Sequence, residues 1–372
     1  MLRRVFVVNA GSSSVKLRTV EPDGSICARA DLGPPGPDLA DRLGTFLDAS
    51  PPPHAVGHRV VHGGTRFTGP VVINRAVRYA LDELREIAPL HNPPALAAID
   101  AVGKARPELP AVACFDTAFH GDLPPEASTY ALPARWRQDW GLRRFGFHGL
   151  SCSWAVRRVH ELTGGGADRQ RLVICHLGAG ASVTAVLGGR SVDTTMGYTP
   201  LEGLVMATRS GDVDPGILLW ALGHGMSSAD LEHSLENASG LAGLVEKSGG
   251  DFRLILQRRT NGDPEAALAL DVYLHRLRAK IAAMAAAAGG IDVLVFTGGV
   301  GEHAAQVRSD CCNKLTWLDI AIDPDANNAV GDADADISTP AARVRTFVVQ
   351  SREELVIAEL TRQALGESDK LS

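Results

Sequence analysis

The chain has 372 residues, of which 45% are hydrophobic and 22% charged, so it has the composition of a soluble globular protein and the length for two domains. Its formal net charge of −6 argues against nucleic acid or an anionic membrane as the main partner, and an anionic substrate would need locally placed Arg and Lys. The six Cys lack metal-ligand spacing, and no apolar stretch is long enough for an export signal or a membrane span. We therefore expect a cytoplasmic protein with free thiols.

The N-terminal segment predicts a β-hairpin with a polar tip. Residues 5–8 form an apolar strand pattern, 9–14 form a turn of small polar residues, and 15–20 alternate like a second strand. Backbone N–H groups, serine hydroxyls and Lys16 at such a tip suit an anionic phosphate. No helix pattern follows the glycine, so the segment is neither a Walker loop nor a dinucleotide fingerprint.

The next part of the chain alternates between strand and helix patterns. A Pro-rich loop at 33–53 carries one helix pattern, at 39–47, and Asn74 is expected to cap a later helix. Strands are predicted at 55–64, where a glycine turn ends the strand, and at 111–115, and helices at 76–87 and 93–106. The second strand delivers Asp116 at its carboxyl end, where ligands gather in α/β sheets.

The second half of the chain repeats the hairpin pattern of the first. Residues 172–187 again read as strand, Gly/Ser turn and strand, which suggests a duplicated domain, although two β-hairpins can resemble each other by chance. A crossing at 123–140 and a helix at 151–162 precede this hairpin, and an irregular loop at 193–216 follows it. We then predict a helix from Pro264 to 288 with Asp263 as its cap, followed by a strand at 292–296 that leads into a glycine turn at 297–303. The last elements are a strand at 344–349 and a helix at 352–365 with a capping box of Ser351 and Glu354.

These features together predict phosphoryl transfer. Two phosphate-binding hairpins facing each other across a cleft, a nucleotide turn at 298–302, and Arg59 and Arg209 on glycine-flanked loops supply positioning and positive charge. His148 near two glycines and acids at Asp116 and Glu353 complete the set. Taken alone, the pattern predicts an ATP-dependent kinase or ATPase.

The exact residues of the motifs are more specific than this general pattern. Asn9-Ala-Gly-Ser-Ser-Ser-Val-Lys16 resembles the opening signature of the acetate kinases. Further motifs that resemble this family follow in its order: 58–64, 88–94, 115–120, 145–149, 176–180, 193–216, 251–253, 296–302 and 353–358. The resemblance implies an α/β fold of two domains with duplicated actin-like (ribonuclease H-like) topology and a nucleotide cleft between them. Domain I would comprise 1–118 and 355–372, and domain II would comprise 119–354.

The resemblance also implies the reaction. It is the reversible, Mg²⁺-dependent, direct in-line transfer of a phosphoryl group from ATP to acetate, giving acetyl phosphate and ADP, with Mn²⁺ as an alternative cation. The partners would be these small molecules and a second copy of the chain in a homodimer, with no nucleic acid and no membrane.

Individual roles follow from matching motif positions. Arg59 would bind acetate or acetyl phosphate oxygens, Arg209 and His148 would stabilise the phosphoryl group in transfer, and Asp116 would be the catalytic acid. Asn9 and Glu353 would hold Mg²⁺. The methyl pocket would consist of Val61, Leu90, Phe147 and Pro200, and Val61 favours acetate over propionate by a modest margin. The nucleotide would contact Ser12, Ser14, Lys16, His176, Leu177, Gly178, Ala179, Gly180, Asp251, Phe252, Arg253, Gly299, Val300, Gly301, Glu302 and His303.

Structural readings of the same residues stay open at this point. Arg59 could extend to solvent from a strand end, His148 could be a structural histidine, Asp116 could cap a turn, and Glu353 could simply favour a helix N-terminus. His62, His91 and His120 could be structural or orient substrate.

The chain also departs from the family pattern. Cys152, Ala179 and His303 stand where the family has His, Asn and Asn, which bears on nucleotide affinity and on the choice of phosphoryl donor. The alternative functions are a propionate- or butyrate-preferring kinase, an actin- or chaperone-like ATPase module, and a catalytically weakened relative.

Overall fold

The computed structural model describes residues 3–11, 14–85, 92–165 and 169–366. The chain divides into two compact units. The first contains residues 1–121, 147–154 and 352–372, and the second contains 122–146 and 155–351. Residues 147–154 thus group with the N-terminal unit, whereas the sequence assigns them to the second domain; the predicted domain limits remain a prediction.

Within the described residues, the first unit contains a six-stranded mixed sheet. Its strands are β1 (Val5–Ala10), β2 (Val15–Val20), β3 (Ile26–Leu32), β4 (Ala55–Val60), β5 (Val71–Val72) and β6 (Ala111–Phe115). They lie in the order β3-β2-β1-β4-β6-β5. The strands β1, β4 and β6 are parallel, and the other neighbours are antiparallel.

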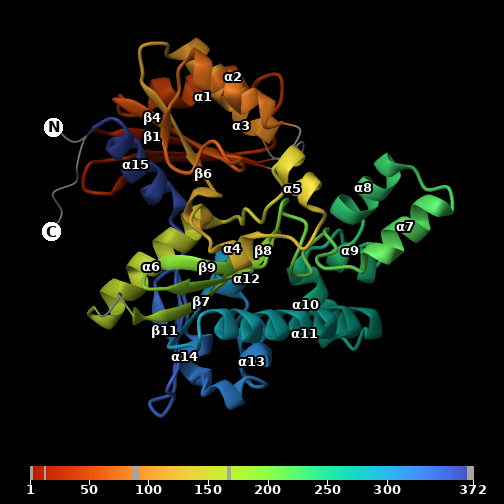
Figure 1. The fold of residues 1–372 in the computed structure, drawn as a ribbon. Coiled ribbons are helices and arrows are strands. Elements are labelled where there is room, and N and C mark those ends of the chain that lie inside the picture. Colours follow the sequence, from red (N-terminus) through yellow and green to blue (C-terminus); the bar gives the residue numbers. More distant parts are fainter. Residues whose placement is uncertain (1–2, 12–13, 86–91, 166–168, 367–372) are drawn as a thin grey trace. The chain divides into compact units, whose positions relative to one another are not determined.

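The sheet of the second unit has the same topology. Its strands are β7 (Arg171–Leu177), β8 (Ala181–Leu187), β9 (Arg190–Thr194), β10 (Val293–Thr297), β11 (Ala335–Asp336) and β12 (Arg345–Val348). The order β9-β8-β7-β10-β12-β11 repeats that of the first sheet strand for strand, including which neighbours are parallel. The predicted duplication and the predicted actin-like α/β class are therefore confirmed (Figure 1).

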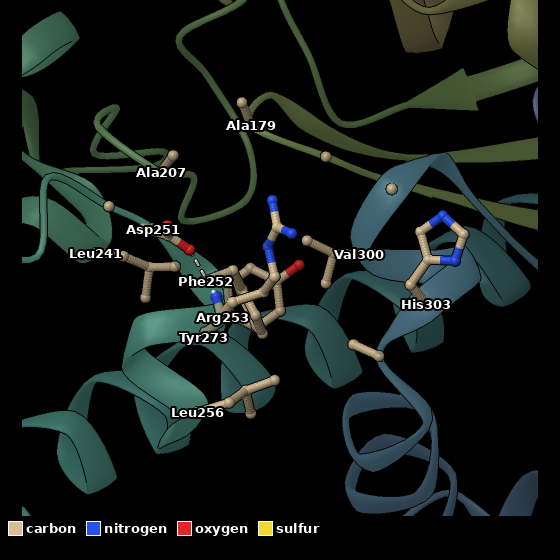
Figure 2. A pocket seen from close by; sticks show the side chains of 14 residues that line it. Ala179, Ala207, Leu241, Asp251, Phe252, Arg253, Leu256, Tyr273, Val300 and His303 are labelled. Carbon is tan, nitrogen blue, oxygen red and sulfur yellow. Dashed lines mark hydrogen bonds between the residues drawn. The ribbon is translucent and has the colours of Figure 1, made fainter. Parts of the chain in front are cut away.

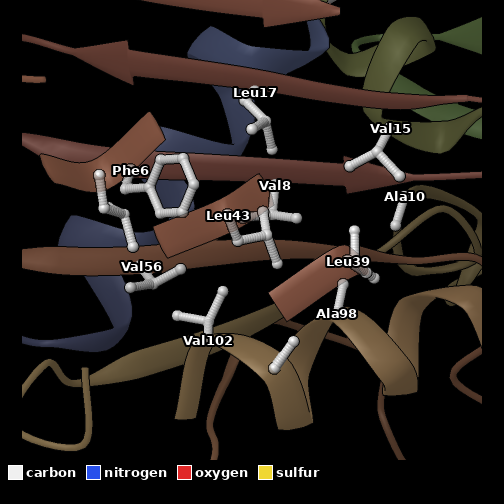
Figure 3. Packing of buried hydrophobic residues seen from close by; sticks show 12 residues of the cluster. Phe6, Val8, Ala10, Val15, Leu17, Leu39, Leu43, Val56, Ala98 and Val102 are labelled. Carbon is white, nitrogen blue, oxygen red and sulfur yellow. The ribbon is translucent and has the colours of Figure 1, made fainter. Parts of the chain in front are cut away.

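Helices cover both faces of the first sheet because successive residues of β1 point to opposite faces. Phe6 and Val8 pack with Leu43 of α1 (Leu39–Ala49) and Val102 of α3 (Asn92–Ala105), as Figure 3 shows. Val5 and Val7 lie in a second cluster with residues of α15 (Glu353–Ala364). A Cβ on Gly57 of β4 would approach Thr361 Oγ1 of α15, so the glycine permits close packing of this helix.

The remaining helix of the first unit is α2 (Arg75–Glu83), which Asn74 caps as predicted by accepting a hydrogen bond from Val77 N. A 3₁₀ turn follows β6 at Ala118–His120. The helix α6 (Gly149–Thr163) begins with residues of the first unit and continues with residues of the second.

Within the described residues, the helices of the second unit lie before and between its strands. They are α4 (Pro125–Ser128), α5 (Ala134–Trp140), α7 (Pro215–Gly223), α8 (Ser228–Asn237), α9 (Gly240–Leu244), α10 (Phe252–Thr260), α11 (Pro264–Ala287), α12 (Gly298–His303), α13 (Ala305–Cys312) and α14 (Pro324–Asn328), with a 3₁₀ turn at Thr316–Leu318. The side chain of Asp263 caps α11 as the sequence predicts.

The structure contradicts one predicted local motif. The capping box of Ser351 and Glu354 is absent, because α15 begins at Glu353 with Arg352 at the cap position. The backbone N–H of Ser351 instead donates to Glu302 Oε1 at 2.9 Å. All six Cys are free, as expected, and no helix among the described residues has the length and apolar character to span a bilayer.

Candidate active site

A buried ion pair lies at the carboxyl ends of two parallel strands in the first unit. Arg59 is near the end of β4, and Asp116 directly follows β6, the neighbouring strand. The Arg59 guanidinium donates from Nε to both Asp116 oxygens at 3.1 Å and from Nη2 to Oδ2 at 2.5 Å. Asp116 is 1% exposed. The alternatives in which Arg59 extends to solvent and Asp116 caps a turn are therefore wrong.

Burial dominates the electrostatics of this pair. It raises the pKa of Asp116 to about 6, and the nearby Glu353 carboxylate adds to the rise, while Arg59 opposes it. Burial disfavours the charged form of Arg59, but Asp116 and Glu353 outweigh it, so the pKa of Arg59 lies above its ordinary value. Arg59 is therefore a permanent cation next to a carboxylate that takes a proton more readily than usual.

Asn9 and Glu353 extend the pair into a cluster of four residues. Asn9 Oδ1, at the end of β1, accepts from Arg59 Nη1 at 3.2 Å, and Asn9 Nδ2 donates to Glu353 Oε2 at 3.0 Å. Glu353 Oε2 also lies 3.8 Å from Arg59 Nε. Lys16 is the cross-strand partner of Asn9, so both side chains leave the same face of the hairpin. Four separate elements thus bring these groups together.

His148 joins this cluster through the backbone. Gly149 N donates to the carbonyl oxygen of Asp116 at 2.9 Å, and a Cβ on Gly149 would lie 2.2 Å from that oxygen. No other residue could therefore bring the chain so close at this point. His148 itself has a φ of 58°, a conformation rare outside glycine that is often found at functional sites.

Buried histidines support the neighbouring Phe147. His120 Nε2 donates to the Phe147 carbonyl oxygen at 2.9 Å, and the rings of His62 and Phe147 meet edge to face at 5.4 Å. Burial lowers the pKa of His120 to about 4, so this ring is neutral and acts as a support. Val61 is buried beside His62 in the chain. Leu90, His91 and Ser12 lie outside the described residues.

The second unit holds Arg209 in the irregular loop that the sequence predicts. Its Nε lies 3.2 Å from Glu236 Oε2 near the end of α8, and its Nη1 donates to the Pro200 carbonyl oxygen at 3.2 Å. Burial lowers the pKa of Arg209 below its ordinary value and raises that of Glu236. Arg209 is thus oriented by the Pro200 carbonyl group on one side and by Glu236 on the other.

A cavity of about 470 Å³ in the second unit gathers half of the residues predicted to bind nucleotide. The turn of the β7–β8 hairpin contributes Gly178 and Ala179, the start of α10 contributes Asp251, Phe252 and Arg253, and α12 contributes Gly299, Val300 and His303. Figure 2 shows Arg253 extending up the middle of this cavity, between Ala207 and Val300. A largely apolar cavity of this size with a few polar groups suits a nucleoside.

The chain path explains why these segments meet. Ala207 N donates to the Ala179 carbonyl oxygen at 3.1 Å, which joins the irregular loop to the hairpin turn. A Cβ on Gly250 would lie 2.3 Å from the Ala207 carbonyl oxygen, so glycine is needed for the approach of the next segment. Asp251 Oδ1 then caps α10 by accepting from Arg253 N at 2.9 Å.

Some predicted nucleotide residues do not line the cavity. Glu302 accepts from Gly298 N at 2.8 Å and from Ser351 N at 2.9 Å, so its carboxylate holds the glycine turn in place. Leu177, Gly180 and Gly301 also lie outside the lining, although each is next to a lining residue in the chain, and His176 lies outside it as well. Ser14 and Lys16 belong to the first unit.

Sequence reasoning missed several lining residues: Ala207, Leu241, Gly250, Leu256, Tyr273 and Ala304. Leu256 could have been found, because it lies one helical turn after Phe252. Tyr273 could not, because it reaches the cavity from the middle of α11, where its ring meets Phe252 at 5.1 Å.

The chain matches the sequence profile of the Acetokinase family over residues 48–359. This protein belongs to the Acetokinase family. Among its relatives, an acetate kinase of Gloeobacter violaceus is 47% identical over 82% of this chain and 75% of that protein, and one of Thermosipho africanus is 38% identical over 98% of both chains. The profile match, which covers most of the chain, supports the resemblance noted in the motifs.

Solved structures of the family have the same fold. The acetate kinase of Porphyromonas gingivalis superposes with a TM-score of 0.88 at 35% identity, covering 98% of this chain and all of that one. A propionate kinase of Francisella tularensis superposes with a TM-score of 0.89 at 32% identity, covering the same fractions. Both neighbours are carboxylate kinases by name, and they differ in the acid that they are named for.

Proposed function

We propose that this acetokinase is an acetate kinase, which reversibly transfers the γ-phosphoryl group of ATP directly to acetate and releases acetyl phosphate and ADP. The observation that carries the proposal is the cluster of Arg59, Asp116, Asn9 and Glu353 in a chain of the Acetokinase family. Acetyl phosphate made in this way would be a precursor of acetyl-CoA, and the enzyme would work in the cytoplasm as a homodimer.

Arg59 is suited to bind the carboxylate of the substrate. Its planar guanidinium is permanently charged, and Asp116 and Asn9 fix its orientation from two sides. A bound acetate would take up part of this charge, and its oxygen would be positioned for attack on the γ-phosphorus. Phosphoryl transfer needs in-line positioning and charge stabilisation more than covalent help.

Arg209 and His148 would stabilise the phosphoryl group in transfer. Arg209 has two of its nitrogens anchored by Glu236 and Pro200, so little ordering remains to be done when an anion arrives. Asp116 would act as the catalytic acid, since its raised pKa lets it share a proton with the reacting oxygen near neutral pH. Ser12, Ser14 and Lys16 would contact the phosphates from the first hairpin.

Asn9 and Glu353 fit a magnesium site. Amide and carboxylate oxygens are the donors that Mg²⁺ prefers, and Glu353 Oε1 takes no hydrogen bond within the described residues. No cluster of three or more His, Cys, Asp or Glu side chains suited to a metal occurs in the part of the chain that the structure describes. We expect the cation to be held by one or two side chains, waters and substrate phosphates, where it would neutralise phosphate charge. Mn²⁺ would fit the same donors.

Acetate-dependent formation of acyl phosphate, trapped as the hydroxamate, tests the proposal. The purified chain is incubated with Mg²⁺ and ATP, then with GTP or pyrophosphate, in the presence and absence of acetate. We expect hydroxamate only when acetate is present. ATP hydrolysis that acetate does not change, without hydroxamate from any donor, would contradict the proposal and favour an ATPase module.

Propionate is the second candidate substrate, because a propionate kinase is among the structural neighbours. Val61, Phe147 and Pro200 would form the methyl pocket, with Leu90 as a further predicted member. One methylene in such a pocket changes binding by about 1–3 kcal/mol. We expect kcat/KM to fall in the order acetate, propionate, butyrate, and Val61→Ala to narrow the gap between the first two. An unchanged ratio in the variant would remove Val61 from the pocket.

A further inference from the structure

One of the two anchors of Arg209 is a backbone group. Glu236 contacts Arg209 through its side chain, whereas the second contact is the Pro200 carbonyl oxygen, which accepts from Arg209 Nη1 at 3.2 Å. Residues 195–203 belong to no helix or strand, so no regular ladder of hydrogen bonds fixes the path of the chain at this carbonyl group. The orientation of Arg209 therefore depends on whatever else holds this segment in place.

The carboxylate of Glu202, two residues after Pro200, joins two side chains from an earlier segment. Its Oε2 accepts from the Tyr130 hydroxyl at 2.5 Å, and its Oε1 accepts from Arg144 Nη2 at 2.6 Å. The Arg144 guanidinium also lies over the Tyr130 ring, 5.5 Å from its centroid. Burial raises the pKa of Tyr130, so its hydroxyl keeps its proton and donates it to the carboxylate. Each of the three side chains thus contacts the other two.

This network also binds the backbone on the N-terminal side of Pro200. Arg144 Nη1 donates to the carbonyl oxygens of residues 195 and 196 at 3.2 and 3.0 Å. The Tyr130 hydroxyl accepts from Tyr198 N at 3.0 Å. Both contacts precede Pro200, and the carboxylate described above follows it, so the network holds the segment on both sides of the carbonyl group that orients Arg209.

The network packs directly against the loop at Gly197. A Cβ on Gly197 would lie 1.8 Å from Glu202 Oε2 and 2.2 Å from the Tyr130 hydroxyl oxygen. Glycine is therefore required at this position for the carboxylate to reach the hydroxyl. The carbonyl oxygen of Gly197 also accepts from Phe145 N at 3.0 Å, directly after Arg144 in the chain.

The loop that carries Arg209 begins directly after Glu202. Gly203 N donates to Asp212 Oδ1 at 2.8 Å, and Asp212 N donates to the Gly203 carbonyl oxygen at 3.0 Å. These two hydrogen bonds close residues 203–212 into a loop. Glu202 thus holds the base of this loop as well as the segment around Pro200.

We propose that Glu202 is a positioning residue for phosphoryl transfer, which fixes the Pro200 carbonyl group and the base of the 203–212 loop so that Arg209 is oriented before an anion arrives. The inference rests on the role proposed above for Arg209. Glu202 acts through other residues, because its two carboxylate oxygens are taken by Tyr130 and Arg144. Its effect should therefore appear in kcat, and it should depend on the geometry of the side chain more than on its charge.

Hydroxamate formation by Glu202 variants tests the proposal, with circular dichroism to show that each variant is folded. We expect Glu202→Ala to lower kcat about tenfold to a hundredfold with little change in KM for ATP, since misplacing a positioned group costs about this much. Glu202→Gln keeps the length of the side chain, an acceptor for Arg144 and an amide that can donate to the Tyr130 hydroxyl, so it should retain most of the activity. Glu202→Asp keeps the charge but is one methylene group shorter, and it should lose most of the activity.

Tyr130→Phe provides an independent test of the same network. It removes the hydroxyl that joins Glu202 to Tyr198 N, so it should lower kcat in the same way and by a smaller factor. Because both residues act through one network, the double variant should be no slower than Glu202→Ala alone. Glu21→Ala is the matched control, because Glu21 is also a half-buried glutamate, lies 2.7 Å from an arginine, Arg4, and belongs to the first unit. It should behave as the wild type.

The outcomes separate this proposal from the proposed reaction. Unchanged kcat in folded Glu202→Ala would overturn the positioning role, and so would a higher kcat in Glu202→Asp than in Glu202→Gln, which remains decisive if the alanine variant does not fold. Losses that multiply in the double variant would show that Glu202 and Tyr130 act separately. A wild type that forms no hydroxamate would overturn the proposed reaction, and the role of Glu202 in it as well.

Discussion

Arg59 is held by groups from three other elements, and this number of contacts defines its role. Asp116, Asn9 and Glu353 surround its guanidinium within one buried cluster. One carboxylate is enough to neutralise the charge of a buried arginine. The second carboxylate and the amide therefore give the cluster more oxygen ligands than Arg59 alone requires. Burial of the cluster raises the pKa of Asp116, and the Glu353 carboxylate adds to the rise.

The pH dependence of the reaction should report Asp116. Its pKa of about 6 means that the carboxyl group loses its proton as the pH rises through 6, and a catalytic acid without its proton is inactive. We predict that kcat/KM of the wild type falls as the pH rises above about 6 and that the residual activity of Asp116→Asn has a flat profile. If kcat/KM of Asp116→Asn changed at the same pH as that of the wild type, the titration would belong to another group.

Glu236 should control the orientation of Arg209. Its carboxylate lies 3.2 Å from Arg209 Nε, while Glu232, one turn earlier on α8, is exposed. We predict that Glu236→Ala lowers kcat about tenfold to a hundredfold with little change in KM, since misplacing a positioned group costs about this much. Glu236→Gln keeps an acceptor and should retain most of the activity, and Glu232→Ala should behave as the wild type. Equal losses in Gln and Ala would show that charge matters and orientation does not.

At the scale of elements, the start of α10 carries both a cap and part of the cavity. Asp251 accepts hydrogen bonds from Arg253 N and Leu254 N, and the same turn lines the cavity. We predict that Asp251→Ala costs about 1 kcal/mol of stability and raises KM for ATP, whereas Asp251→Asn preserves both.

Asp263 provides the control for this experiment. It caps α11 in the same manner, by accepting from Glu265 N and Ala266 N, and it does not line the cavity. Asp263→Ala should therefore cost about as much stability and leave KM for ATP unchanged. If both alanine variants raised KM equally, general destabilisation would explain the effect and the local role of the cap would be wrong.

The elements that the sequence predicts well are those with local signals. Both hairpins, the capped helices α2 and α11, and the buried strand β10 follow from alternation, caps and apolar runs. The capping box at Ser351 failed, because the tertiary contact of Ser351 N with Glu302 outcompetes the local one. A motif of two residues does not show which hydrogen-bond acceptor the backbone N–H of Ser351 takes in the folded chain.

The candidate site divides in the same way. Arg59 and Asp116 could be placed together from sequence, since Arg59 lies in a predicted strand just before its glycine turn and Asp116 follows the carboxyl end of the next predicted strand. The proximity of Asn9 and Glu353 follows only from the family resemblance and not from local patterns, because the two residues are 344 positions apart and meet only when α15 packs on the first sheet. The backbone hydrogen bond between Gly149 and Asp116 likewise depends on tertiary structure.

At the scale of the whole molecule, the strand-for-strand repetition of the two sheets is the main finding. Both use the same order and the same parallel core of three strands, which places functional residues at corresponding carboxyl ends: Arg59 and Asp116 in one unit and the glycine turn of α12 in the other. A duplicated fold thus supplies the Arg59 cluster in one unit and the cavity in the other from one topology.

The buried core of the first unit also predicts that the protein becomes less stable at acid pH. Neither ring nitrogen of the buried His58 has a hydrogen-bond partner within the described residues, and burial lowers its pKa to about 3. The unfolded chain, with an ordinary pKa of about 6.5, binds this proton first, so the free energy of unfolding falls as the pH drops below 6.5.

We predict a loss of about 1 kcal/mol per pH unit between pH 6 and 4 from this residue alone, measured by denaturant titration. His58→Leu should remove that part of the slope, whereas His275→Leu, on the exposed side of α11, should not. Identical slopes for the wild type and His58→Leu would contradict the assignment.

The central claim is that the cluster around Arg59 binds a carboxylate so that it can be phosphorylated. The hydroxamate assay on the wild type, Arg59→Ala and Arg18→Ala tests this claim most directly. Arg59→Ala removes the centre of the cluster, and Arg18→Ala removes another ion-paired arginine of the same sheet, which pairs with Asp31. We predict that Arg59→Ala lowers acetate-dependent hydroxamate formation by several orders of magnitude and that Arg18→Ala remains close to the wild type. Wild-type activity in folded Arg59→Ala would contradict the account.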